Sequence, residues 1–264
     1  MTRYSAMFER CAATGEGAFG AFLMLGDPDL ATSAALLDAL VEGDADMVEL
    51  GIPFSDPVAD GPVIQQASIR ALAAGVRTRH CLDLIAAFRA RHDAIPIGIL
   101  TYANIVAARG IETFCRELAD AGADSLLVAD VPTLEAAPYA AAAKAAGIDL
   151  VMIAAPNTPH ATLARIASLS SGYTYCVARA GVTGADAELS LDHRSLFAAL
   201  DEVGAPPPVL GFGISSPSHV GQALASGAAG VISGSAIVSK VGEGPAAVRD
   251  FVESMKAATR RPNA

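Results

Sequence analysis

The feature that most constrains the fold of this chain is a regular alternation of short apolar runs with longer amphipathic runs. The short runs are apolar throughout, which is typical of parallel strands covered on both faces. Eight of them are predicted to be strands: Ala18–Leu25, Met47–Gly51, Ile95–Tyr102, Ser125–Asp130, Leu150–Ala155, Tyr173–Ala178, Pro208–Gly213 and Gly230–Gly234. The predicted helices include Ala31–Glu42, Thr78–Arg91, Ile111–Ala121, Leu134–Ala146, Ala161–Leu169, Pro217–Ser226 and Pro245–Ala258.

Eight strands that each lead into a helix predict an α/β fold, a single (β/α)8 TIM barrel with parallel strands and an outer ring of helices. The 264 residues suit one such barrel, which typically takes about 250. We therefore expect residues 1–264 to form a single domain. An open doubly wound sheet is the alternative, but Gly26-Asp27-Pro28 follows the first strand in place of a dinucleotide-binding glycine pattern.

Charge and composition exclude several classes of function. The net charge is −10 and the lysines and arginines are not clustered, which argues against nucleic-acid and membrane partners. No apolar run approaches the ~20 residues of a membrane span, and the N-terminus lacks a signal-peptide pattern, so a cytoplasmic protein is expected. The four cysteines and five histidines are not spaced as metal ligands, so no metal site is predicted.

In such a barrel the active site lies at the carboxyl ends of the strands, and Glu49 is the first candidate there. It lies inside an otherwise apolar strand, on the same face as Met47 and Gly51. A carboxylate facing the barrel interior is costly to desolvate, so its pKa should rise toward that of a general acid or base near neutral pH. A purely structural, hydrogen-bonded glutamate is the alternative.

Asp60 lies in the turn-rich loop that follows the same strand. Pro62 is typical of the first residue of a helix, with Gly61 or Asp60 as its cap. On local grounds alone, capping is therefore the favoured function of Asp60. Because the loop belongs to the catalytic face, Glu49 and Asp60 are also placed to flank a ligand.

Glycines after the last two strands predict a phosphate site. Gly213 and Gly234 allow close approach of the backbone, and Ser235 can begin a short helix whose N–H groups face the cleft. The loop 179–184, after the sixth strand, is a candidate lid, and Gly184 could add another amide.

The lysines argue against two mechanisms that require a lysine in the active site. Lys144, Lys240 and Lys256 all lie away from the carboxyl ends of the predicted strands. A Schiff-base aldolase or a pyridoxal-phosphate enzyme requires a lysine there. Acid–base chemistry by carboxylates on a phosphorylated substrate is what remains.

The run ELGIPFSDPVADGP at residues 49–62 resembles the signature of tryptophan synthase α subunits. Further similar motifs are Leu25–Pro28, Tyr102–Asn104, Val128–Pro132, Gly172–Tyr175, Gly181–Gly184, Gly211–Pro217 and Ile232–Val238. The similarity extends from near the N-terminus to the last helix. Met24, Thr101 and Ala180 depart from residues that are common in that family.

The resemblance implies a function for individual residues. Glu49 and Asp60 correspond to the catalytic carboxylates, and Thr183 to a lid threonine that meets the aspartate. The implied walls of an indole pocket are Phe22, Leu100, Tyr102, Tyr175 and Phe212. The implied phosphate-binding positions are Gly184, Gly213, Gly234 and Ser235. The implied surface facing a β subunit comprises Pro53–Asp60, Asn104 and Pro132.

The activity implied by the resemblance is cleavage of indole-3-glycerol phosphate to indole and glyceraldehyde 3-phosphate, in tryptophan biosynthesis. Glu49 would move protons and Asp60 would stabilise charge on the indole ring. No cofactor is expected in this chain, whereas pyridoxal phosphate is expected in a separate β subunit within an α2β2 complex. The alternatives are a stand-alone lyase without a β partner, a phosphosugar isomerase, and a non-catalytic barrel that binds a phosphorylated ligand.

Overall fold

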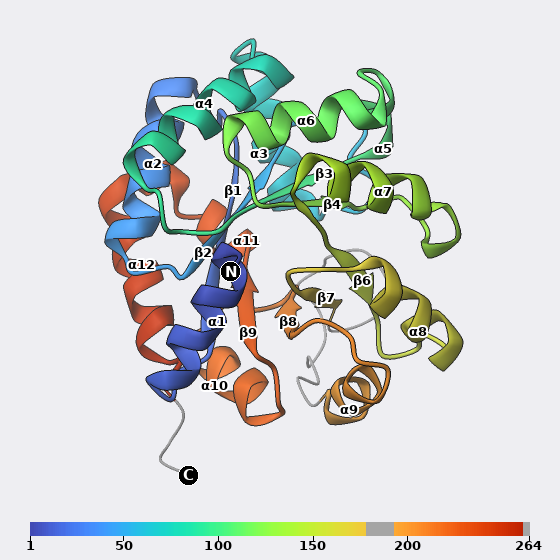
Figure 1. Ribbon diagram of the computed structural model, residues 1–264. Coiled ribbons are helices and arrows are strands. Elements are labelled where there is room, and N and C mark those ends of the chain that lie inside the picture. The colour runs from blue at the N-terminus through green and yellow to red at the C-terminus, as the bar shows by residue number, and fades with distance from the viewer. Residues whose placement is uncertain (178–192, 261–264) are drawn as a thin grey trace.

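The computed structural model describes residues 1–177 and 193–260, in which helices surround a central parallel sheet (Figure 1). The strand segments are β1 (Ala18–Met24), β2 (Met47–Gly51), β3 (Ile97–Thr101), β4 (Ser125–Val128), β5 (Asp149–Leu150), β6 (Met152–Ala154), β7 (Thr174–Val177), β8 (Pro208–Gly211) and β9 (Gly230–Ser233). Each ladder between neighbouring segments is parallel.

The sheet closes on itself because β1 pairs with β2 on one side and with β9 on the other. Hydrogen-bonded neighbours follow the order β5-β4-β3-β2-β1-β9-β8-β7-β6. Only Val151 separates β5 from β6 in the sequence, and its N–H donates to the Leu126 carbonyl at 2.9 Å. β5 and β6 are therefore halves of one strand, and the prediction of an eight-stranded barrel is confirmed.

The prediction of one continuous fifth strand, Leu150–Ala155, is wrong in one respect, because Val151 interrupts it between β5 and β6. β5 pairs with β4 only as far as Leu126↔Leu150, whereas β6 pairs with β7. Beyond that point the chain of β4 turns away, and the Val128 carbonyl accepts a hydrogen bond from the N–H of Val131 at 3.3 Å. The ladder between β4 and the fifth strand ends there.

The helices confirm the predicted outer ring. They are α1 (Arg3–Ala13), α2 (Leu30–Glu42), α3 (Pro62–Ala73), α4 (Thr78–Arg91), α5 (Ala103–Ala107), α6 (Ile111–Ala121), η1 (Thr133–Glu135), α7 (Ala137–Ala146), α8 (His160–Leu169), α9 (Arg194–Glu202), α10 (Pro217–Ala225), α11 (Ser235–Val238), η2 (Val241–Glu243) and α12 (Pro245–Ala257). The sequence analysis named no helix at α1, α5 or α9. The predicted helix Leu134–Ala146 is divided into η1 and α7, because Pro138 belongs to a first helical turn and cannot lie in a helix interior.

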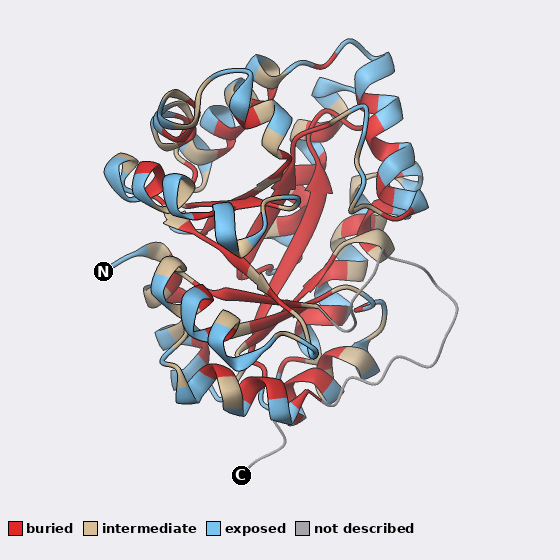
Figure 2. Ribbon diagram, turned by 90° about the vertical axis from the view of Figure 1, so that its right-hand side faces the viewer, coloured by how far each residue is buried: buried red, intermediate tan, exposed pale blue. Residues whose placement is uncertain are grey.

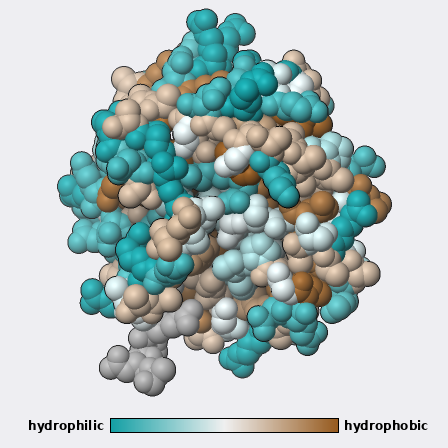
Figure 3. Space-filling model, in the orientation of Figure 1, coloured by the Kyte–Doolittle hydropathy of each residue, from teal (hydrophilic) through white to brown (hydrophobic). Residues whose placement is uncertain are grey.

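The strands form the buried inner layer of the barrel, and the helices form the outer layer. All residues of β1 and β2 are buried, and Figure 2 shows buried strands enclosed by helices that expose one side to solvent. On the face seen in Figure 3, hydrophilic residues lie between smaller hydrophobic patches. Of the described residues, none belongs to a helix long and apolar enough to cross a membrane.

The N-terminal helix α1 packs against the amino-terminal end of the barrel. Tyr4 and Met7 on this helix are buried, and the Tyr4 hydroxyl lies 2.8 Å from the hydroxyl of Ser125, the first residue of β4. Asp46, which precedes β2, lies near the same end and binds Arg10 of α1 at 2.9 Å and Lys256 of α12 at 2.8 Å. These contacts hold α1 and α12 against the strands.

Thr101 gives a prediction for stability. Among the described residues, its buried hydroxyl is one of the side-chain groups that have no hydrogen-bond partner. Burying a polar group without a partner costs roughly 1–3 kcal/mol. We expect Thr101→Val to raise the free energy of unfolding by about 1 kcal/mol, measured as a higher urea midpoint at an unchanged m value.

Thr174→Val is the matched control. Thr174 is also fully buried in a strand, but its hydroxyl donates to the Pro206 carbonyl at 3.0 Å. This variant should be less stable than the wild type, because a bond is lost and an acceptor is left without it. A loss of stability in both variants would contradict our interpretation of Thr101.

Candidate active site

Glu49 lies in the middle of β2 with its side chain inside the barrel, and it is only 3% exposed. Its Oε1 accepts a hydrogen bond from the Tyr173 hydroxyl at 3.1 Å. Burial raises the pKa of Glu49 to about 8, the Tyr173 bond lowers it, and the charge of Asp60 raises it further. The predicted rise is confirmed, and the carboxyl group can hold a proton near neutral pH.

Asp60 lies in the loop after β2, and its side chain does not cap the next helix. The N-cap of α3 is Gly61, and no side chain makes a capping bond there. The Asp60 carboxylate instead interacts with the Tyr102 hydroxyl. Burial raises the pKa of Asp60 to about 6, while the bond with Tyr102 lowers it. Asp60 therefore remains largely ionised at a pH where Glu49 remains largely protonated.

Tyr102 also fixes the loop that carries Asp60. Its hydroxyl accepts a hydrogen bond from the N–H of Ala59 at 3.2 Å. Its ring stacks on Phe54, with 5.3 Å between the ring centroids. The position of the Asp60 carboxylate thus depends on β3, at whose end Tyr102 lies, as well as on β2.

Apolar side chains from the other strands surround this region. Phe22 lies on β1 opposite Glu49 in the ladder, and Leu100 on β3 pairs with Gly51. Tyr175 on β7 meets Phe212 edge to face, with ring centroids 5.9 Å apart. A Cβ atom at Gly211 would lie 2.1 Å from the Tyr175 hydroxyl, so only glycine leaves room for this ring.

The predicted phosphate positions fall at the ends of β8 and β9. Phe212 and Gly213 both adopt positive φ, +59° and +80°, which turns the chain sharply after β8. Gly234 is the N-cap of α11, and Ser235 begins that helix as predicted. The first N–H groups of a helix have no intrahelical acceptor, so they can bind an anion. Thr183 and Gly184, like the departure at Ala180, lie outside the described residues.

The other two departures from the family pattern lie near the same strands. Met24 accepts a contact from the Ser68 hydroxyl at 3.6 Å, and its methyl group would lie 3.0 Å from a Cβ atom at Gly51. Thr101, whose buried hydroxyl has no hydrogen-bond partner, lies on the opposite face of β3 from Leu100, which shares the inward face with Gly51 and Glu49. In the part of the chain that the structure describes, the side chains of Met24 and Thr101 form no hydrogen bond with Glu49 or Asp60.

Within residues 1–177 and 193–260, no group of three or more histidine, cysteine, aspartate or glutamate side chains is arranged to hold a metal ion. Lys144 lies in α7, Lys240 follows α11 and Lys256 lies in α12. The lysines therefore lie in the helical layer, as the sequence analysis expected.

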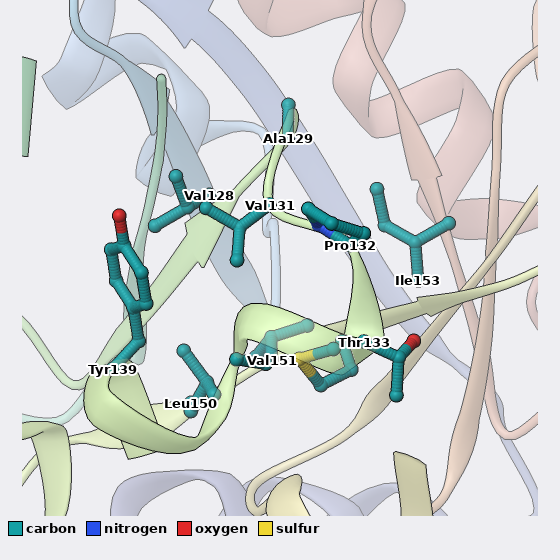
Figure 4. Close-up of a pocket in the computed structure, with 11 residues that line it drawn as sticks. Val128, Ala129, Val131, Pro132, Thr133, Tyr139, Leu150, Val151 and Ile153 are labelled. Atoms are coloured by element: carbon teal, nitrogen blue, oxygen red, sulfur yellow. The ribbon is translucent and has the colours of Figure 1, made fainter. Parts of the chain in front are cut away.

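A separate cavity of about 230 Å³ lies beside the end of β4, where its ladder with the fifth strand stops. Figure 4 shows its largely apolar walls, with the hydroxyls of Thr133 and Tyr139 among them. It is lined by Val128, Ala129, Val131, Pro132, Thr133, Ala136, Tyr139, Leu150, Val151, Met152 and Ile153. Glu49 and Asp60 are not part of its wall.

The sequence analysis missed Tyr173 and Tyr4, which both lie near Glu49. Alternation along the strand places Tyr173 on the face of Tyr175, so its inward direction could have been predicted. Tyr4 gave no comparable signal, because the helix that carries it was not predicted and lies outside the strand–helix repeat.

Comparisons with known proteins agree over nearly the whole chain. The sequence model of the family described as "Tryptophan synthase alpha chain" matches residues 8–263. A protein of that name from Shewanella amazonensis is 52% identical over 98% of this chain and 100% of its own length. A chain of Mycobacterium tuberculosis tryptophan synthase superposes with a TM-score of 0.90 at 33% identity, covering 99% of each chain. Tryptophan synthase subunit alpha from Legionella pneumophila gives 0.88 at 29% identity, over 98% of each chain.

The raised pKa of Glu49 predicts how stability depends on pH. Between the ordinary glutamate value of 4.5 and about 8, the native protein keeps a proton that the unfolded chain has lost. The free energy of unfolding should therefore fall as the pH rises through this window, by on the order of a few kcal/mol from this group. Urea unfolding of Glu49→Gln at several pH values should show a smaller fall and higher stability than the wild type above pH 8. An equal fall in both proteins would contradict the assignment to Glu49.

Proposed function

The chain belongs to the tryptophan synthase alpha chain family, and we infer that it is a carbon–carbon lyase that cleaves indole-3-glycerol phosphate to indole and glyceraldehyde 3-phosphate in tryptophan biosynthesis. The observation that carries this proposal is the pair of carboxyl groups with separated pKa values on β2 and its loop. One group can donate a proton while the other remains negative. These are the two states that the reaction requires.

We propose Glu49 as the general acid and base. The protonated carboxyl group donates its proton to C3 of the indole ring, which becomes a cationic electron sink. The resulting carboxylate then takes the proton from the hydroxyl on the adjacent glycerol carbon. That oxygen forms the aldehyde as the C–C bond breaks, and the bonding electron pair returns to the ring. Glu49 ends the cycle protonated, as it began.

Asp60 is proposed to accept a hydrogen bond from the indole N–H. Protonation of C3 places positive charge on that nitrogen, so a nearby carboxylate stabilises the transition state more than the ground state. The pKa of about 6 supports this assignment, because the group is mostly ionised at neutral pH. The absence of a capping bond from Asp60 leaves its carboxylate available for such a contact.

The remaining site residues are proposals of the same kind. Phe22, Leu100, Tyr102, Tyr175 and Phe212 are proposed walls of the indole pocket. Thr183, outside the described residues, is proposed to be the lid threonine that meets Asp60. Gly184, Gly213, Gly234 and Ser235 are proposed to bind the phosphate through backbone amides. The positive φ values after β8 and the free amides at the start of α11 support the described part of that site.

We propose that this chain uses no cofactor and works with a separate β subunit that carries pyridoxal phosphate, in an α2β2 complex in the cytoplasm. Residues 1–264 would form one domain of that complex. The proposed contact surface comprises Pro53–Asp60, Asn104 and Pro132. Val58, an apolar residue of that loop, is 68% exposed. Phe54 of this loop stacks on Tyr102, and Tyr102 is hydrogen-bonded to Asp60. A partner that binds the loop would therefore also affect the position of the Asp60 carboxylate.

The first experiment measures indole release from indole-3-glycerol phosphate by the purified chain, with and without a tryptophan synthase β subunit. We expect slow release by the chain alone and a large acceleration with the β subunit. Fast release that the β subunit does not change would favour a stand-alone lyase. No release under either condition would favour a non-catalytic barrel that binds a phosphorylated ligand.

Substitution of the two carboxyl groups tests their proposed functions. Glu49→Gln should lower kcat by on the order of 10²- to 10⁴-fold without loss of substrate binding, because the proton carrier is removed. Asp60→Asn should lower kcat about 10²-fold, because it removes the stabilising charge. Glu9→Gln, on the exposed side of α1, is the control and should resemble the wild type. Normal turnover by Glu49→Gln would refute the mechanism.

A further inference from the structure

A buried serine joins the two parts of the proposed phosphate site that the structure describes. Ser233, the last residue of β9, is fully buried, and its hydroxyl donates to the Ile214 carbonyl at 2.7 Å. Ile214 directly follows Gly213, and Ser233 directly precedes Gly234. The bond therefore sets the spacing of these two glycines, whose amides are proposed to bind the phosphate.

The imidazole ring of His219, on α10, contacts the same segment. Its Nδ1 lies 3.0 Å from the Gly213 carbonyl, and 3.3 Å from both the hydroxyl oxygen and the backbone nitrogen of Ser215. A carbonyl oxygen can only accept a hydrogen bond, so the shortest of these contacts requires a proton on Nδ1. With that proton in place, the ring donates to the Gly213 carbonyl and can also donate to the Ser215 hydroxyl.

The turn after β8 depends on contacts of this kind. Phe212 and Gly213 both adopt positive φ, a conformation that a residue other than glycine keeps only where its surroundings hold it. The Phe212 ring is held by its contact with Tyr175. Gly213 has no side chain, and its backbone is free to adopt many conformations. The hydrogen bond from His219 to the Gly213 carbonyl is therefore what restricts that residue.

The contacts of His219 differ from those of an ordinary helix cap. His219 is the third residue of α10, whose N-cap is Ser216. In a capping box, the side chain at the third position returns to the backbone N–H of the N-cap residue. The N–H of His219 does bond to the Ser216 hydroxyl, but its ring reaches past Ser216 to Ser215 and Gly213. The ring thus holds the loop that precedes the helix.

We propose that His219 is a positioning residue for the phosphate site, because its ring fixes the Gly213 carbonyl and so keeps the Gly213 N–H directed at the phosphate of the substrate. This inference rests on the proposed function of Gly213 and Gly234. His219 acts through the backbone of Gly213 rather than by binding the phosphate itself. Its removal should lower the affinity for the phosphate group and leave proton transfer by Glu49 unchanged.

The test compares His219→Leu with His219→Asn. Leucine removes the donor, whereas asparagine places an amide N–H close to the position of Nδ1, because both nitrogens are attached to Cγ. Phosphorus-31 NMR measures the binding of glycerol 3-phosphate. Indole fluorescence measures the binding of indole, because the chain has no tryptophan of its own. His219→Leu should weaken glycerol 3-phosphate binding roughly five- to tenfold, as expected for one lost hydrogen bond, and leave indole binding unchanged. His219→Asn should bind both ligands as the wild type does.

Turnover provides a second readout and a matched control. His219→Leu should raise the KM for indole-3-glycerol phosphate by a similar factor and leave kcat within about twofold, because the lost interaction is made equally in the ground and transition states. His160→Leu should leave both constants unchanged, since His160 also lies in the first turn of a helix, α8, but its side chain is 66% exposed. Thermal unfolding shows that each variant is folded, and His219→Ala keeps the test available should His219→Leu not fold.

Four outcomes would contradict part of this scheme. A His219→Leu protein with a lower Tm but unchanged glycerol 3-phosphate affinity and KM would overturn the inference, since the ring would then support only the start of α10. Equal weakening in His219→Asn and His219→Leu would also overturn it, because the hydrogen bond would not be the cause. A wild type that binds no glycerol 3-phosphate would refute the proposed phosphate site and the inference together. A wild type that binds it but releases no indole would refute the proposed function, whereas the binding titrations would still test His219.

Discussion

The pairing of β1 with β9 is the constraint on which the rest of this structure depends. Ala18–Ala21 lies against Gly230–Ser233, more than two hundred residues away in the sequence, and this ladder turns an open sheet into a barrel. Closure satisfies the backbone groups that an edge strand would leave free, and it creates an interior shielded from water on all sides. Strand residues that would be half-covered in an open sheet become fully buried.

The pKa of Glu49 depends directly on this closure. A carboxyl group on an open strand would reach solvent and keep an ordinary pKa, whereas inside the barrel burial raises its pKa to about 8. Asp60 lies one loop further along the chain and is less enclosed, so its pKa rises only to about 6. The same chain segment thus provides an acid and a carboxylate at one pH, because the barrel encloses the two groups to different extents.

Tyrosines connect these carboxyl groups to elements that the strand–helix repeat does not include. Tyr102 couples Asp60 to the exposed loop through Phe54, and Tyr173 couples Glu49 to α1 through Tyr4. The first connection leads to the carboxyl ends of the strands, and the second to the opposite end of the barrel. Residues at both ends of the barrel therefore contribute to the positions of the Glu49 and Asp60 carboxyl groups.

The sequence by itself determined the eight strands, because runs that are buried on both faces must be apolar along their whole length. It also predicted the inward Glu49 with its raised pKa and the helix beginning at Ser235, since strand alternation and helix-start signals act over a few residues. The motif at residues 49–62 identified the family that the comparisons then showed. These properties are local, so they can be read from neighbouring residues.

Only the tertiary structure decided which groups meet. Whether Asp60 caps α3 or turns toward Tyr102 depends on β3, and local sequence favoured the capping alternative that the structure contradicts. The break at Val151 follows from β4 and β7 pairing with different halves of one strand. The bond from Tyr173 to Glu49 joins residues 124 positions apart, and Tyr4 reaches Ser125 across 121. Such contacts depend on barrel closure and on where α1 packs, neither of which is encoded in a pattern a few residues long.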